Sequence, residues 1–192
     1  LEKLILNNNC IFQLDRRFFI NMKNLRNLDL GSNLIVNLNR YHFIHLNNSK
    51  LSWLNLEKNK LTHMDCGLFE FLSLLNYLFL SENLFRTIEK NCFQLLIKLK
   101  TLQLNNLFNL EKSEKSLETR IFIPSLKALD LKKTSLNILN YFSFSSILEL
   151  DLSNNNLIYD FYSRIPFKHV TRLILSNINM NESLKFLNSN FN

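Results

Sequence analysis

Apolar residues in the stretch 25–38, LRNLDLGSNLIVNL, follow neither of the two common periodicities. The spacing begins with a gap of three residues, changes to two, and then passes the polar Asn33. An amphipathic helix repeats its apolar residues every three or four positions, and a half-buried strand repeats them every second position. Neither element alone accounts for this order.

The same order of apolar and polar residues recurs along the chain. Tight copies begin at Leu1, Leu25, Leu51 and Leu75, and looser copies begin at Leu99, Leu126, Ile147 and Val170. Five units also place a Phe five positions after their sixth apolar residue: Phe19, Phe43, Phe69, Phe93 and Phe144. Repetition at about 24 residues predicts a solenoid in which each unit makes one turn. Each coil buries its core against its neighbours.

Each place in the unit has a physical role in such a coil. The fourth and sixth residues should point inward from a short strand, and the third, fifth and seventh should point outward, because side chains alternate. Strands of successive coils then pair in parallel, about 4.8 Å apart. The Asn at the ninth place must turn inward and bond to the backbone, since a buried amide is tolerated only when it is hydrogen-bonded.

This spacing resembles the leucine-rich repeat family, in the class of about 24 residues typical of extracellular receptors, including Toll-like receptors. The resemblance implies an α/β horseshoe of about eight repeats, with a parallel sheet on the concave face and irregular or short helical segments on the convex face. Three units depart from the pattern because Leu107, Thr134 and Ile178 occupy the Asn place. Thr134 can still hydrogen-bond, so we expect the weakest ladder at the other two units.

Residues 1–192 are expected to form one domain, a fragment of a longer solenoid without its end caps. The stretch 111–120, EKSEKSLETR, fits no repeat position, and a solvated loop is favoured over a ligand-gripping insertion. No apolar run reaches the roughly 20 residues of a membrane span, so no membrane contact is expected within this segment.

Composition changes the picture little. The formal charge of +7 concerns solubility and encounter with partners, not the fold. Three cysteines are too few and too scattered to predict a disulfide framework, and Cys92 is interpreted as a packed thiol. The stretch THMDC around Cys66 assembles neither a metal site nor a nucleophile with its base. We therefore expect no cofactor, no metal and no enzyme activity.

The strongest candidate site is aromatic. The outward places of adjacent strands bring Trp53 beside Tyr77, with Phe79 two residues further along. Three outward aromatic residues in contact mark an interaction surface, although cross-strand aromatic pairs also stabilise sheets. The hypothesis is that these residues anchor a protein ligand or co-receptor on the concave face. Oligomeric state stays open.

Two weaker candidates are a lysine cluster that could bind anions and a pair of possible glycosylation sites. Lys100, Lys127, Lys132 and Lys133 could bind a polyanion or nucleic acid, but a solvated face is the favoured interpretation. Sequons occur at Asn47 and Asn181, no more often than chance predicts in a chain so rich in Asn. Asn47 lies in the inserted stretch 45–50, where a glycan would fit.

Together these features predict a non-enzymatic protein-recognition module in signal transduction. By resemblance, it belongs to the ectodomain of a Toll-like or related leucine-rich repeat receptor, a membrane glycoprotein, on the extracellular side of the plasma membrane. An intracellular, cytoplasmic scaffold or adaptor and a secreted matrix or adhesion protein are the alternatives.

Overall fold

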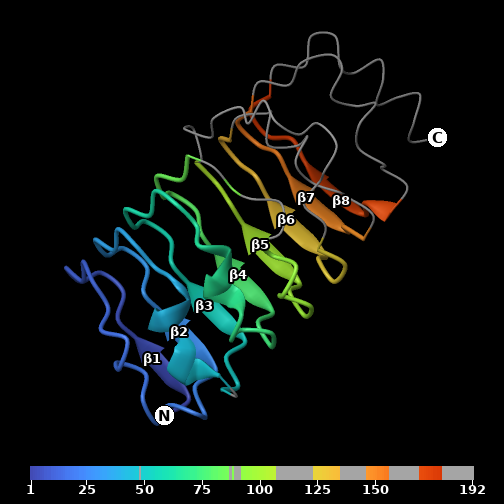
Figure 1. Cartoon of the computed structure of the whole chain (residues 1–192). Coiled ribbons are helices and arrows are strands. Elements are labelled where there is room, and N and C mark those ends of the chain that lie inside the picture. Colours follow the sequence, from blue (N-terminus) through green and yellow to red (C-terminus); the bar gives the residue numbers. More distant parts are fainter. Residues whose placement is uncertain are drawn as a thin grey trace.

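A computed structural model describes residues 1–47, 49–86, 88, 92–106, 123–134, 146–155 and 169–178. Eight strands of three residues each form one parallel sheet, in chain order (Figure 1). They are β1 (Lys3–Ile5), β2 (Asn27–Asp29), β3 (Trp53–Asn55), β4 (Tyr77–Phe79), β5 (Thr101–Gln103), β6 (Ala128–Asp130), β7 (Glu149–Asp151) and β8 (Arg172–Ile174). The predicted leucine-rich repeat solenoid is confirmed, with one strand for each predicted unit.

The strands pair in the register that the repeat predicts. The central residue of each strand is a Leu that pairs with the Leu of the next strand, as Leu54 does with Leu78. Both of these side chains are fully buried. Because side chains alternate, the first and third residues of each strand face the other way, onto the concave face.

The other side of the coils carries three short 3-10 helices among the described residues. These are η1 (Arg40–His42), η2 (Ile44–Leu46) and η3 (Cys66–Phe69). Asn39 and Asp65 begin η1 and η3 by accepting hydrogen bonds from the backbone N–H groups of Tyr41 and Gly67. The expectation of irregular and short helical segments on this side is confirmed.

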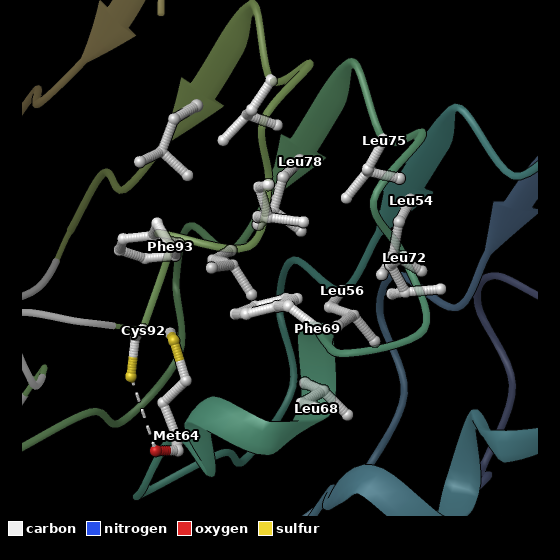
Figure 2. Packing of buried hydrophobic residues seen from close by; sticks show 14 of the residues in the cluster. Leu54, Leu56, Met64, Leu68, Phe69, Leu72, Leu75, Leu78, Cys92 and Phe93 are labelled. Carbon is white, nitrogen blue, oxygen red and sulfur yellow. Dashed lines mark hydrogen bonds between the residues drawn. The ribbon is translucent and has the colours of Figure 1, made fainter. Parts of the chain in front are cut away.

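Phenylalanine fills the wide side of the core, as predicted. Phe19, Phe43, Phe69 and Phe93 are all fully buried, whereas Phe144 lies outside the described residues. The ring centroids of Phe19 and Phe43 are 5.6 Å apart, and those of Phe69 and Phe93 are 5.7 Å apart. Figure 2 shows Phe69 and Phe93 in the core beside Leu54 of β3 and Leu78 of β4. These contacts hold consecutive coils together.

The predicted asparagine ladder is also present. Asn59 is 2% exposed; its Nδ2 donates to the carbonyl of Leu30 in the preceding coil at 3.0 Å, and its Oδ1 accepts from the N–H of Ile35 at 3.0 Å. Asn33, Asn83 and Asn155 repeat this arrangement. Thr134 donates only to Leu131 of its own coil, at 2.6 Å. Of the two apolar replacements, Leu107 lies outside the described residues and Ile178 is half-buried.

The residue at the eighth place of each coil has a left-handed backbone conformation, which the sequence pattern did not predict. The φ angles of these residues lie between 48° and 59° in Asn8, Ser32, Lys58, Glu82, Asn106, Lys133, Asn154 and Asn177. None is a glycine, the residue that adopts this conformation without strain. The turn is held because the N–H at this place donates to the next coil, as Lys58 does to the Ser81 carbonyl at 3.0 Å.

The cysteine prediction is wrong. Cys66 and Cys92 form a disulfide between neighbouring coils, with their Cα atoms 4.2 Å apart. Cys92 is fully buried, but as half of a cystine and not as a packed thiol. The pairing follows from the repeat, because a separation of 26 residues is close to one coil and stacks the two positions. Figure 2 shows Cys92 beside Met64, whose carbonyl oxygen lies 3.9 Å from both Sγ atoms.

Candidate functional site

The concave face consists of the third, fifth and seventh residues of each coil. Its ionisable side chains are three cations and five carboxylates, although the whole chain carries a formal charge of +7. They are Lys3, Lys132, Arg172, Asp29, Glu57, Asp130, Glu149 and Asp151. The surface that the sheet presents is therefore acidic in a basic protein.

The three predicted aromatic residues meet on this face. Trp53 pairs in register with Tyr77, and Asn55 pairs with Phe79, across the neighbouring strands β3 and β4. The ring centroids of Trp53 and Phe79 are 5.2 Å apart, with an angle of 48° between the ring planes. Tyr77 is 42% exposed, and the other two rings are half-buried. We call Trp53, Tyr77 and Phe79 the aromatic patch.

Polar groups hold the strand ends beside the aromatic patch. The Oδ1 atom of Asp29 accepts hydrogen bonds from Asn55 Nδ2 at 2.9 Å and from the N–H of Gly31 at 3.0 Å. Asn55 Oδ1 in turn accepts from the N–H of Glu57 at 2.9 Å. A side chain on Gly31 would press against Asn55, because a Cβ there would lie 2.6 Å from Nδ2. The small residue keeps this pair of side chains in place.

Glu57 lies at the seventh place, two residues beyond Asn55. Burial raises the pKa of Glu57 above its ordinary value, and the nearby charges of Glu82 and Asp130 act in the same direction. A hydrogen bond with Ser81 and the charge of Lys58 oppose the shift. Lys58 is itself paired with another carboxylate, because its Nζ lies 3.7 Å from Glu82. Glu57 is thus a half-buried carboxylate that forms no ion pair with the described residues.

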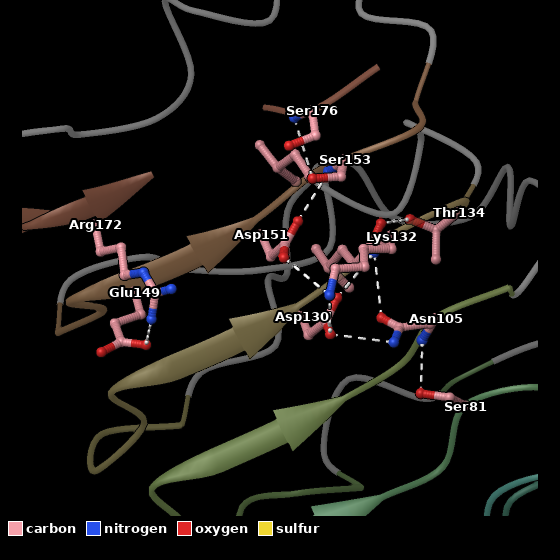
Figure 3. A network of polar contacts seen from close by, with 12 residues as sticks. Ser81, Asn105, Asp130, Lys132, Thr134, Glu149, Asp151, Ser153, Arg172 and Ser176 are labelled. Carbon is pink, nitrogen blue, oxygen red and sulfur yellow. Dashed lines mark hydrogen bonds and ion pairs between the residues drawn. The ribbon is translucent and has the colours of Figure 1, made fainter. Parts of the chain in front are cut away.

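A polar network occupies the concave face at β6 to β8 (Figure 3). Lys132 Nζ lies 3.3 Å from Asp130 and 3.0 Å from Asp151. The hydrogen bond to Asp151 raises the pKa of Lys132. Arg172 pairs with Glu149 at 3.6 Å. Together with β5, these strands line a hollow of about 250 Å³, whose three carboxylates are already engaged by Lys132 and Arg172.

A larger hollow, of about 570 Å³, lies away from the sheet between 13–17 and 39–42. Its Arg17 side chain is already paired with Asp15 at 3.3 Å, and both are exposed. No group of three His, Cys, Asp or Glu side chains suited to a metal ion occurs among the described residues. The larger hollow therefore offers no assembled chemistry, and the aromatic patch is the better site.

Comparison with known proteins agrees with this geometry. The family model described as leucine rich repeat matches residues 1–50 and 49–109, more than half of the chain. The chain is a leucine-rich repeat protein. A comparison with curated protein sequences found no match.

Solved structures share the fold of this leucine-rich repeat protein. The APL1 leucine-rich repeat domain is 24% identical with a TM-score of 0.58, and 93% of this chain covers 56% of that one. The Toll–Spatzle complex of Drosophila gives 22% identity and a TM-score of 0.63, with 93% and 27% covered. InlJ of Listeria monocytogenes, whose functional domain includes a cysteine ladder, is 23% identical with a TM-score of 0.56. The match covers 95% of this chain and 36% of that one. Thus the chain spans about half, or less, of these neighbours.

Leucine-rich repeat domains are typically non-enzymatic protein-interaction modules. Among the described residues, no helix has the length and hydropathy to cross a membrane. The comparisons thus support a general role in protein interaction for this leucine-rich repeat protein.

The predicted lysine cluster is divided between two edges of the sheet. Lys100 and Lys127 directly precede β5 and β6, whereas Lys132 and Lys133 follow β6. The five residue steps from Lys127 to Lys132 span about 16 Å in an extended chain, and Lys132 is held between two carboxylates. Polyanion binding stays a prediction, without a preassembled site on the concave face.

The two sequons differ in what can be said of them. Asn47 is exposed at the end of η2, as expected for the inserted stretch. Asn181 lies outside the described residues, as does the charged stretch 111–120. Glycosylation at either position stays a prediction.

Proposed function

We propose that the chain recognises a protein partner through the aromatic patch on its concave face. The observation that carries this proposal is the exposure of Tyr77 beside Trp53 and Phe79 on a face that is otherwise mostly polar. Aromatic side chains supply much of the binding energy at protein interfaces. The rigid coil loses little entropy on binding, because its backbone is already ordered. The role proposed is non-enzymatic.

We further infer that this segment belongs to the ectodomain of a Toll-like or related leucine-rich repeat receptor, on the extracellular side of the plasma membrane. The Cys66–Cys92 disulfide supports an oxidising compartment, where such bonds persist. It counts against the cytoplasmic scaffold or adaptor. A secreted matrix or adhesion protein is equally compatible with a disulfide, and a membrane span in the full-length sequence would distinguish the receptor from it.

Peptide selection on the immobilised chain tests the proposed function. A random displayed-peptide library is panned on the wild type, and the selected peptides are retested on a W53S/Y77S variant. The peptides should bind the wild type and should no longer bind W53S/Y77S. Circular dichroism should show that this variant keeps its fold. The matched control is F12S/V36S, because Phe12 and Val36 are 68% and 43% exposed away from the concave face. Peptides that no longer bind F12S/V36S but still bind W53S/Y77S would show that the binding site lies outside the aromatic patch.

The compartment has its own test. The full-length protein is expressed in secreting cells, alkylated without reduction and digested for mass spectrometry. A peptide pair linked through Cys66 and Cys92 supports the extracellular assignment. Recovery of both cysteines as alkylated free thiols would favour the intracellular alternative.

A further inference from the structure

The distribution of charge points to the chemistry of the partner. The concave face has an excess of carboxylates, although the chain as a whole is basic. The net positive charge of the whole chain would favour an acidic partner. The carboxylates of the concave face favour a basic partner at that face. Because complementary potentials set specificity at interfaces, this contrast is informative about what the sheet receives.

Most concave cations are already neutralised or distant from the aromatic patch. Lys132 is held by Asp130 and Asp151, and Arg172 is paired with Glu149. Lys3 lies on β1, two strands from β3. Among the described residues, Glu57 therefore forms no ion pair with a concave cation.

Two carboxylates flank the patch on the β3 side. Asp29 pairs in register with Asn55, the strand neighbour of Phe79. Glu57 follows Asn55 by two residues, so its Cα lies about 7 Å further along the same face. Ser81, its hydrogen-bonding partner, is likewise two residues beyond Phe79. An extended Arg or Lys side chain that covers the rings can therefore reach the Glu57 carboxylate.

We propose that the aromatic patch and Glu57 together receive an arginine or lysine side chain of the partner protein. The faces of Trp, Tyr and Phe rings attract a cation through their quadrupoles, and Trp does so best. Glu57 supplies the full negative charge, and burial strengthens its attraction for a cation relative to an exposed carboxylate. This inference rests on the proposed function, because it names the chemistry of the partner at that same site.

The raised pKa of Glu57 is consistent with this assignment. A half-buried carboxylate that forms no ion pair is poorly stabilised when charged, and an incoming cation would provide the missing counter-charge. Glu57 therefore has more to gain from a cation than an exposed carboxylate such as Glu70, which already pairs with Arg40 at 3.4 Å.

The peptides selected on the aromatic patch test the inference directly. They should be enriched in Arg or Lys, and replacing the basic residue by citrulline, the neutral isostere of arginine, should weaken binding about tenfold or more. Binding is followed by the fluorescence of Trp53, the single Trp of the chain. E57Q should weaken the basic peptide about threefold to tenfold and leave the citrulline peptide unchanged.

Matched variants separate the outcomes. E70Q removes the same charge from the convex side and should leave both peptides unaffected, and thermal unfolding should show that E57Q is folded. Patch-dependent peptides without basic residues, or equal affinity for the arginine and citrulline forms, would overturn the cation assignment and leave the proposed function standing. A selection that yields no patch-dependent peptide would overturn both.

Discussion

Asparagine at the ninth place should stabilise the solenoid in proportion to the bonds it makes between coils. Removing the Asn59 side chain takes away the acceptor of the Ile35 N–H in a site that is 2% exposed, and it leaves the Leu30 carbonyl with one donor, Asn33, in place of two. The Leu56 carbonyl of its own coil, bonded at 3.1 Å, also loses a donor. One unsatisfied buried group, the N–H of Ile35, costs about 1–3 kcal/mol, so N59A should lower the free energy of unfolding by about that amount.

Asn9 provides a control of the same residue type at the same place of the repeat. Its amide donates only within its own coil, to Leu6 at 3.0 Å and Asn7 at 3.2 Å, and its side chain is exposed. Water can replace those bonds, so N9A should cost less than about 1 kcal/mol. N59D is a second test, because it keeps the acceptor but turns a carboxylate toward carbonyl oxygens, and it should cost at least as much as N59A.

Urea unfolding should be followed by circular dichroism and by the fluorescence of Trp53, which lies in the same coil as Asn59. Coincident transitions would justify a single free energy, whereas separate transitions would mean that coils open one by one. If N59A and N9A lower the free energy of unfolding by the same amount with either probe, the hydrogen bonds between coils do not provide the additional stability predicted for Asn59.

Three further changes test other parts of the coil. Reducing the Cys66–Cys92 bond, which spans 26 residues, should lower the free energy of unfolding by about 3.5 kcal/mol on the loop-entropy model, measured by urea melts with and without reductant; the Cys10→Ser variant should behave as wild type. T134N should add a bond to the preceding coil and raise stability by about 1 kcal/mol in the same melt. E57Q should be more stable than wild type at neutral pH, and the gain should vanish on acidification. Burial raises the pKa of Glu57 in the folded state. The wild type therefore loses stability as the pH rises from the ordinary pKa of glutamate through the folded-state pKa. Equal melting temperatures of E57Q and wild type at neutral pH would contradict this.

The inward half of the fold could be predicted because it depends on a repeated pattern. Leu54, Asn59 and Phe69 occupy places that are also buried in the two adjacent coils, which begin at Leu25 and Leu75, so one register predicts them all. The neighbours Trp53 and Tyr77 follow from the same register. The polar bonds at the strand ends do not, because they depend on individual side chains.

The disulfide could not be predicted from the register alone. Cys66 and Cys92 occupy different places in their units, the sixteenth and the eighteenth, so strict register does not pair them. Their separation of about one coil was the available signal. The register also places Lys127 before β6 and Lys132 after it, at two edges of the sheet. The acidity of the concave face could have been found by reading the charges place by place.

Phe79 shows that the aromatic patch replaces a structural hydrogen bond. At the equivalent fifth place, Asp29, Asn55, Asp130 and Asp151 each accept a bond from the N–H two residues later, at 2.9–3.2 Å. Phe79 has no acceptor, so the N–H of Ser81 cannot be bonded in this way. F79N should restore that bond and be more stable than F79A by about 1 kcal/mol.

Both substitutions remove the ring that contacts Trp53, so that loss cancels in the comparison of F79N with F79A. Both should abolish patch-dependent peptide binding, measured by Trp53 fluorescence. If F79N is no more stable than F79A, the fifth place gains nothing from an acceptor, and Phe79 carries no structural cost. A more stable F79N that no longer binds would mean that this coil gives up a turn bond to present an aromatic ring, as expected where a surface serves recognition more than folding.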